Sequence, residues 1–204
     1  MTVRAVVFDV GGVLERVDEE GAWLSSWQRR LGMSEPDFAD ALHQVDPEEQ
    51  IHVGGLTEAQ FRRRYADALG LTGTQTEEFM QDLWDWYCGE LDERMATFVA
   101  GLRPRYATAI LSNSADGARR EEQSRYRLGD LVDMIVYSHE VGMAKPDPRV
   151  FALTCERLGV GPEACVLLDD AEANVEAARA FGMQAVLHED TQRSIDAVTA
   201  LLAE

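Results

Sequence analysis

Lysine is almost absent from this chain of 204 residues. Lys145 is the only one, and the other 18 of the 19 basic residues are arginine. Basic residues are also outnumbered, because 37 acidic residues leave a formal net charge of −18. A surface this acidic repels nucleic acid and anionic membranes, so we expect neither of them as a partner.

Long hydrophobic runs and closely spaced cysteines are missing as well. No apolar run reaches the roughly 18 residues of a membrane-spanning helix, and the first residues do not form a basic and then apolar leader. The three cysteines, Cys88, Cys155 and Cys165, are an odd number without the spacing of a zinc or redox motif. These absences predict a cytoplasmic protein with reduced thiols.

Apolar residues are plentiful in shorter runs. They make up 46% of the chain, which is enough for the core of one compact domain with an insertion. Helical patterns separate the runs, such as residues 148–158 after the N-cap Asp147 and residues 172–181 before Gly182. This alternation predicts an α/β fold with a doubly wound parallel sheet. The expected strands lie at residues 3–10, 107–111, 134–137, 165–168 and 184–187.

One long segment breaks this alternation. Residues 16–94 show helical patterns and no convincing strand, with a capping box at residues 57–60 opening a helix that runs through residue 69. We predict a helical cap at residues 16–94, inserted after the first strand, and an α/β core at residues 1–15 and 95–204. All four tryptophans fall in the cap, where we expect them to fill its core; alternatively, one or two roof a binding cleft. They are Trp23, Trp27, Trp84 and Trp86.

A run of charged residues marks another expected helix. Residues 119–127 carry four arginines and two adjacent glutamates. This pattern is typical of a solvated helix face with Arg–Glu pairs at helical spacing. The alternative is that the arginines attract anions toward residues 112–113.

Polar residues recur where the predicted strands end. The carboxyl ends of parallel strands meet at one edge of an α/β sheet, and ligands bind there. We therefore expect the side chains at these ends to converge, although they are far apart in the sequence. They are Asp9 at the end of the first strand, Ser112 and Asn113 after the second, Lys145 in the loop after the third, and Asp169 and Asp170 after the fourth.

These residue types suggest one chemistry. Carboxylates at a single point repel one another unless a cation lies between them, and oxygen ligands favour a hard ion such as Mg²⁺. A carboxylate can attack phosphorus to form an aspartyl phosphate, while the metal, a lysine and hydroxyl donors neutralise the transferring group. Lys145 fits this role because a planar guanidinium replaces a compact ammonium poorly.

Four motifs then resemble one known family. Residues 8–14 (FDVGGVL), 111–113 (LSN), 142–147 (GMAKPD) and 168–174 (LDDAEAN) are similar to the motifs of the haloacid dehalogenase-like hydrolase superfamily. The resemblance covers essentially the whole chain, and the helical insertion after the first motif is similar to the cap of the subgroup that acts on small molecules. The chain resembles sugar-phosphate phosphatases of the α-glucose-1-phosphatase kind and the N-terminal phosphatase domains of soluble epoxide hydrolases.

The resemblance implies a role for each motif residue. Asp9 matches the nucleophile, and Asp9, the backbone carbonyl of Gly11 and Asp170 match the Mg²⁺ ligands. Asp169 and Asn174 match groups that orient metal-bound waters.

A further set of motif residues matches the phosphate-binding groups of the family. They are Ser112, the backbone of Asn113 and Lys145, of which Lys145 also counts as catalytic. The implied activity is Mg²⁺-dependent hydrolysis of a small phosphorylated metabolite, with a sugar phosphate as one candidate. The motifs leave the substrate's identity and the oligomeric state open.

One position departs from the family pattern. Most of its phosphatases carry a second aspartate where this chain has Gly11, and general acid–base help of that kind is worth roughly 10²–10⁴-fold in rate. Candidate substitutes are Glu15, His52 and Glu58, and His52 is also a candidate specificity contact. Two alternatives stay open: a metal- and phosphate-binding protein with weak or no turnover, and a haloacid dehalogenase, although that branch carries an aromatic residue at the position of Gly11.

Overall fold

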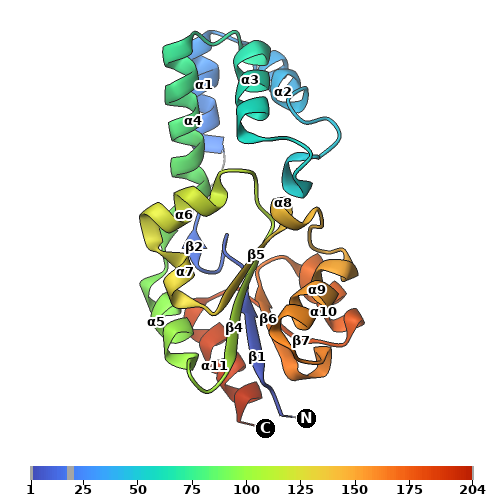
Figure 1. Cartoon of the computed structure of the whole chain (residues 1–204). Helices are drawn as coiled ribbons and strands as arrows, with labels where there is room; N and C mark the ends of the chain where they lie inside the picture. Colours follow the sequence, from blue (N-terminus) through green and yellow to red (C-terminus); the bar gives the residue numbers. More distant parts are fainter. Residues whose placement is uncertain (1, 18–20, 204) are drawn as a thin grey trace.

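A five-stranded parallel sheet forms the centre of the molecule. The computed structural model describes residues 2–17 and 21–203. The strand order is β5-β4-β1-β6-β7, with helices on both faces of the sheet, which confirms the predicted α/β class (Figure 1). Phe8 at the end of β1 pairs with Ile110 of β4 and Leu168 of β6, so these three strands end side by side. The strands are β1 (Ala5–Phe8), β4 (Ala107–Ser112), β5 (Met134–Tyr137), β6 (Cys165–Asp169) and β7 (Gln184–Leu187).

The sheet is buried on both faces, and its central strands are correspondingly apolar. All four residues of β1 are fully buried. Val6 and Phe8 pack toward α5 (Glu93–Leu102), α7 (Leu128–Leu131) and α11 (Thr191–Leu202). Ala5 and Val7 pack toward α9 (Pro148–Leu158) and α10 (Glu172–Phe181) on the other face. Continuous apolar strands of this kind are what a doubly covered parallel sheet requires.

The two helix boundaries predicted from capping residues are confirmed. The side chain of Asp147 accepts a hydrogen bond from the backbone N–H of Arg149, and α9 begins at Pro148. Helix α10 ends at Gly182, which adopts a positive φ of 107°. The remaining elements of this part of the chain are α6 (Ala118–Tyr126), α8 (Ser138–Val141) and η2 (Pro162–Ala164).

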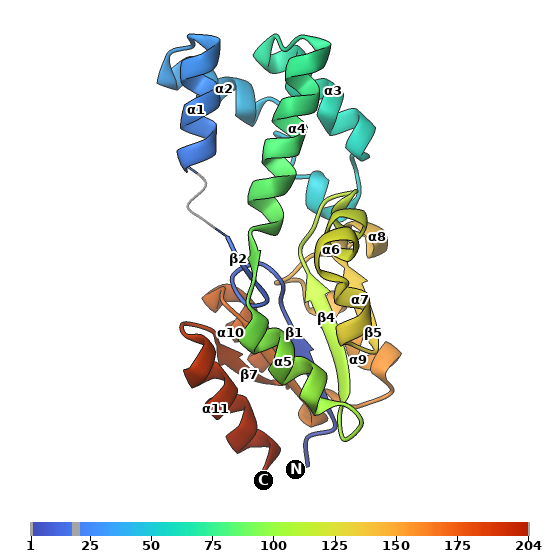
Figure 2. The same ribbon diagram turned by 90° about the vertical axis from the view of Figure 1, so that its left-hand side faces the viewer.

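A group of helices stands over the carboxyl end of the sheet (Figures 1 and 2). This helical region consists of α1 (Gly21–Leu31), α2 (Glu35–His43), η1 (Ile51–Val53), α3 (Glu58–Leu69) and α4 (Gly73–Cys88). Thr57 forms the predicted capping box with Gln60 at the start of α3. Among the described residues, no helix combines the length and the apolar character that spanning a membrane would require.

The expectation of no strand within residues 16–94 is wrong. Two short strands, β2 (Glu15–Arg16) and β3 (Glu90–Leu91), pair antiparallel, with Glu15 opposite Leu91. They lie where the chain leaves the sheet for the helical region and where it returns (Figure 2). Strands of two residues are too short to show an alternating pattern, so the sequence carries no signal for them.

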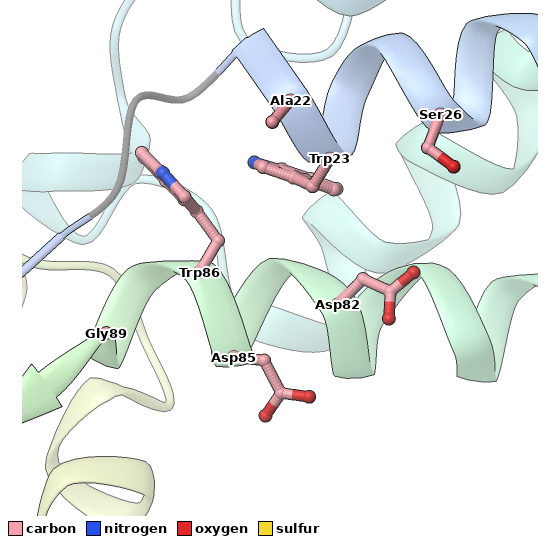
Figure 3. A pocket seen from close by; sticks show the side chains of 7 residues that line it. All are labelled: Ala22, Trp23, Ser26, Asp82, Asp85, Trp86 and Gly89. Carbon is pink, nitrogen blue, oxygen red and sulfur yellow. The ribbon is translucent and has the colours of Figure 1, made fainter.

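The tryptophans divide into two pairs. Trp27 and Trp84 are only 2% and 4% exposed and belong to the apolar core of the helical region, as expected. Trp23 and Trp86 are only partly buried, and their rings stack with centroids 6.0 Å apart. Both line a groove of about 410 Å³ between α1 and α4 (Figure 3). Trp23 and Trp86 therefore do more than fill the core, because they also form part of the wall of this groove.

A tight turn after η1 brings the helical region into contact with α8. Element η1 packs against α8, and Gly54 follows η1 with a positive φ of 73°. A Cβ atom at Gly54 would overlap the backbone carbonyl of His139 in α8. Glycine is therefore required here both by the backbone conformation and by the close approach.

We predict that Gly54→Ala lowers the free energy of unfolding by about 3 kcal/mol or more, because backbone strain and overpacking add. Gly70→Ala is the matched control, since Gly70 has a similar φ of 64° but no atom within 4 Å of an added Cβ. The strain alone should cost this control about 1–2 kcal/mol. Urea denaturation of both variants measures the difference, and equal losses would show that the contact with His139 is unimportant.

Candidate active site

The structure brings the predicted polar residues together at the carboxyl edge of the sheet. Asp9 directly follows β1, Ser112 ends β4, and Asp169 ends β6. Because β1 lies between β4 and β6, these three side chains leave neighbouring strands at the same level. Lys145 reaches the same point from the loop between α8 and α9.

The only lysine of the chain lies between two carboxylates. Its Nζ is 2.8 Å from Oδ1 of Asp9 and 2.7 Å from Oδ2 of Asp169. The side chains of Lys145 and Asp169 are fully buried. An ammonium in this position offsets the repulsion between the two aspartates, which accounts for a lysine in a chain that otherwise uses arginine.

Asn113 holds the lysine's backbone in place. The backbone N–H of Lys145 donates to Oδ1 of Asn113 over 2.8 Å, and Nδ2 of Asn113 donates to the carbonyl of Lys145 over 2.8 Å. The sequence predicted a role only for the backbone of Asn113. Its side chain therefore has a positioning function that the motif alone did not indicate.

Electrostatics keeps the lysine of this cluster protonated. Burial raises the pKa of Asp9 to about 7, although the neighbouring Lys145 ammonium acts in the opposite direction. Burial alone lowers the pKa of Lys145, but the charges of Asp9 and Asp169 outweigh it, so that the pKa is raised. The lysine is therefore protonated at neutral pH, and it is the main group that favours the ionised form of Asp9.

Asp169 is fixed from its other side. Its Oδ1 accepts hydrogen bonds from Nδ2 of Asn174 over 2.9 Å and from the backbone N–H of Ala171 over 3.0 Å. Asp169 is fully buried and Asn174 is 8% exposed. The structure thus places Asp169 beside Lys145 and Asn174 beside Asp169.

Three aspartates offer ligands for a cation. Asp9, Asp169 and Asp170 each have a carboxylate oxygen within 4.8 Å of the others, and Asp170 is the exposed member. An oxygen-only ligand set suits a hard divalent cation. Gly12 has a positive φ of 74°, and a Cβ there would overlap the carboxylate of Asp170, so only glycine fits.

A cavity of about 310 Å³ opens beside these aspartates. Its volume is at the small end of ligand pockets, so it suits a small molecule. Four of its wall residues were predicted site residues, namely Gly11, Ser112, Asn113 and Asp170. The rest of the wall consists of Val10, Gly12, Glu15, Val17, Trp86 and Tyr87.

Only one of the three candidate substitutes for the missing acid reaches this cavity. Glu15 lines it and is fully buried. His52 is exposed in η1 and is not part of the wall. Glu58 pairs with Arg120 at 2.7 Å, and hydrogen bonds from Arg120 hold the pKa of Glu58 below its usual range. An added Cβ at Gly11 would have no atom within 4 Å, so the position that lacks the carboxylate is open space.

A buried acidic network lies next to the cavity. Glu122 of α6 is fully buried, and its carboxylate accepts a hydrogen bond from the hydroxyl of Tyr137. The hydroxyl of Tyr87 interacts with Glu122 and with Ser112, which links the helical region to the end of β4. Burial raises the pKa of Glu122 to about 7, and burial together with the charge of Glu122 raises that of Glu15 to about 9.

The charged residues 119–127 therefore form a solvated helix face only in part. Arg125 and Glu121 form the expected pair at 3.3 Å. The expectation is wrong for Glu122, which turns inward because tyrosine hydroxyls from β5 and α4 are available to it. Sequence reasoning also missed Tyr87, for which the only signal was its place near the end of an expected cap helix.

Comparison with known proteins bears on the same motifs. Residues 3–182 match the family described as haloacid dehalogenase-like hydrolase. The chain belongs to this family. The match includes all four motifs from which the resemblance was drawn, and it confirms that resemblance.

Individual relatives in this family are similar over nearly their whole length. A phosphatase of Mycobacterium tuberculosis is 30% identical over 97% of this chain and 93% of its own. A D-ribitol-5-phosphate phosphatase of Bacteroides thetaiotaomicron is 26% identical over 89% of this chain and 90% of its own. A solved HAD family enzyme of Bacteroides thetaiotaomicron, in complex with magnesium and inorganic phosphate, has a TM-score of 0.78 at 23% identity, covering 92% of this chain and 94% of that one. This last likeness confirms the fold.

For this haloacid dehalogenase-like hydrolase we predict that Lys145→Met lowers the free energy of unfolding by about 3–5 kcal/mol, because it leaves two buried carboxylates without a cation. Lys145→Arg should not restore stability, because the larger planar guanidinium does not fit a fully buried position that holds an ammonium. Urea denaturation in the presence of EDTA measures both effects. Wild-type stability in the arginine variant would show that any cation serves.

Proposed function

We propose that this chain is a Mg²⁺-dependent phosphomonoesterase of a small phosphorylated metabolite, with a sugar or polyol phosphate as the substrate class. The observation that carries the proposal is the buried Lys145 ammonium between Asp9 and Asp169, with the Asp170 carboxylate beside them. This arrangement presents a nucleophile, a cation for phosphate oxygens and a metal-ligand set within one small space.

The reaction would begin at Asp9. Lys145 and the backbone N–H of Val10 both interact with Oδ1 of Asp9, at 2.8 and 2.7 Å, so Oδ2 is the atom that attacks phosphorus. As the bond from Oδ2 to phosphorus forms, the ester bond breaks and the leaving alkoxide takes up a proton from water, because no carboxyl group stands at position 11. A water molecule then attacks the aspartyl phosphate, which releases inorganic phosphate and regenerates the carboxylate of Asp9.

Other residues would stabilise the transferring group. Ser112, the backbone of Asn113 and Lys145 would bind the phosphoryl oxygens, while Asp169 and Asn174 would orient water on the metal. Mg²⁺ held by Asp9, the carbonyl of Gly11 and Asp170 would supply additional positive charge for the phosphoryl group. The three aspartate oxygens within 4.8 Å of one another fit such an ion.

The relatives support the substrate class. One of them is named for ribitol phosphate and another as a phosphatase. The small cavity agrees with a substrate of that size. We further propose that residues 16–94 act as a cap over the substrate and that the protein works in the cytoplasm, where its three buried cysteines remain free. Dehalogenation is disfavoured, because the open space at Gly11 provides no aromatic wall for a halide.

Phosphate release is the direct test of this proposal. Purified protein should release phosphate from sugar and polyol phosphates at millimolar Mg²⁺, and EDTA should abolish the release. Asp9→Asn should lose at least about 10³-fold in kcat, because an amide is not a nucleophile toward phosphorus. If a broad ester panel yields no phosphate while esters still raise the melting temperature, the protein binds phosphate esters without useful turnover. Turnover of a haloacid that EDTA does not affect would favour the dehalogenase alternative.

The missing carboxylate gives a second test. We predict that Gly11→Asp raises kcat for substrates with poor leaving groups by roughly 10- to 100-fold, because it supplies a general acid in open space. For p-nitrophenyl phosphate, whose leaving group needs little protonation, the gain should be much smaller. Steady-state kinetics on both substrates measures the two gains. No gain on either would mean that another group already donates the proton, and an equal gain on both would mean that the new aspartate does not act on the leaving group.

A further inference from the structure

A buried carboxyl group in the cavity wall lacks a partner. Glu15 is fully buried, and neither of its carboxylate oxygens has a hydrogen-bond partner among the residues that the structure describes. Burying a polar group without a hydrogen bond is costly, and the cost is greater for a carboxylate. The same residue lines the cavity beside the aspartates. Its unsatisfied oxygens therefore point to a ligand group that completes them.

The backbone of Glu15 is held firmly. Its N–H donates to the carbonyl of Val10 over 2.9 Å, and its carbonyl accepts from the N–H of Gly12 over 2.8 Å. Its strand, β2, is also paired with β3. These bonds tie Glu15 to the loop that carries Asp9, so its carboxyl group keeps a fixed place relative to the nucleophile.

The cavity has two kinds of wall. Ser112, Asn113 and Asp170 provide the polar groups assigned above to phosphate and metal. Glu15 stands with the rings of Trp86 and Tyr87 from α4, which give an aromatic surface next to a hydrogen-bond acceptor. Aromatic faces contact C–H groups, and carboxyl oxygens accept hydrogen bonds from O–H groups. A polyhydroxy carbon chain presents both.

We propose that Glu15 is the residue that selects a polyhydroxy leaving group, by accepting hydrogen bonds from its hydroxyls. The inference rests on the proposed phosphatase function and specifies its substrate. A hydroxyl completes the carboxyl oxygens without adding a further charge to a buried site, whereas an ammonium would add one. Glu15 is thus a specificity residue and takes no part in the bond changes at phosphorus.

The test compares two series of substrates with the wild type and Glu15→Leu. One series contains polyol monophosphates of three to five carbons, and the other contains n-alkyl monophosphates with the same numbers of carbons. The wild type should prefer the polyol series in kcat/KM. Glu15→Leu should lose about 3- to 10-fold more activity on polyol phosphates than on alkyl phosphates, the range expected for a hydrogen bond to an uncharged group. Equal losses on both series, or a wild type without preference, would overturn the proposal.

A matched control is available in the same neighbourhood. Glu122 is also fully buried and also has an unpartnered carboxylate oxygen, but it does not line the cavity. Glu122→Gln should keep the preference for polyol phosphates. If it removes the preference as strongly as Glu15→Leu does, buried charge in general is responsible and the proposal fails. The proposal also fails if aminoalkyl phosphates are the series that Glu15→Leu discriminates against.

Two further measurements separate the ways in which the test can fail. Glu15→Leu should unfold at the same temperature as the wild type or higher, because it removes a buried polar group without a partner. If this variant does not fold, Glu15→Gln, which keeps one acceptor, should show a partial loss of preference. If the wild type hydrolyses neither series, the proposed function fails. Calorimetric binding of polyol and alkyl phosphates to Asp9→Asn and to Asp9→Asn with Glu15→Leu then tests Glu15 without turnover.

Discussion

The contact between one buried ammonium and two carboxylates governs the rest of the site. Lys145 lies 2.8 Å from Asp9 and 2.7 Å from Asp169, and both aspartates follow or end strands that neighbour each other in the sheet. Without the ammonium, the parallel strands would bring like charges together in a buried space. Asn113 holds the lysine's backbone and Asn174 holds Asp169, so two asparagines from separate segments support this cluster of three charged groups.

Much of the fold and part of the site could be predicted because the signals were local. Continuous apolar runs marked the strands, and Asp147 and Gly182 marked helix ends that the structure shows. Lys145 stood out through its rarity, a feature of composition that needs no structure. The polar residues at strand ends could be grouped because parallel strands end at one edge.

The rest depended on contacts between distant segments. Strands β2 and β3 have two residues each and exist because they pair with each other. In the sequence, Glu122 is one more charged residue in a charged helix. Its burial is explained only by the hydroxyl groups of Tyr87 and Tyr137, which the structure places beside it. The second function of Asn113 is equally invisible in its motif, because it depends on where the Lys145 loop passes.

The short ribbon of β2 and β3 links the wall of the cavity to the loop that follows Asp9. Glu15 is at once a strand residue in this ribbon, a wall of the cavity and the backbone partner of the loop after Asp9. A rotation of the helical region about the ribbon would twist β2 and so shift the loop after Asp9 together with the carboxyl group of Glu15. The positions of Asp9 and Glu15 would then change together, so a mutation that distorts the ribbon should affect both residues at once.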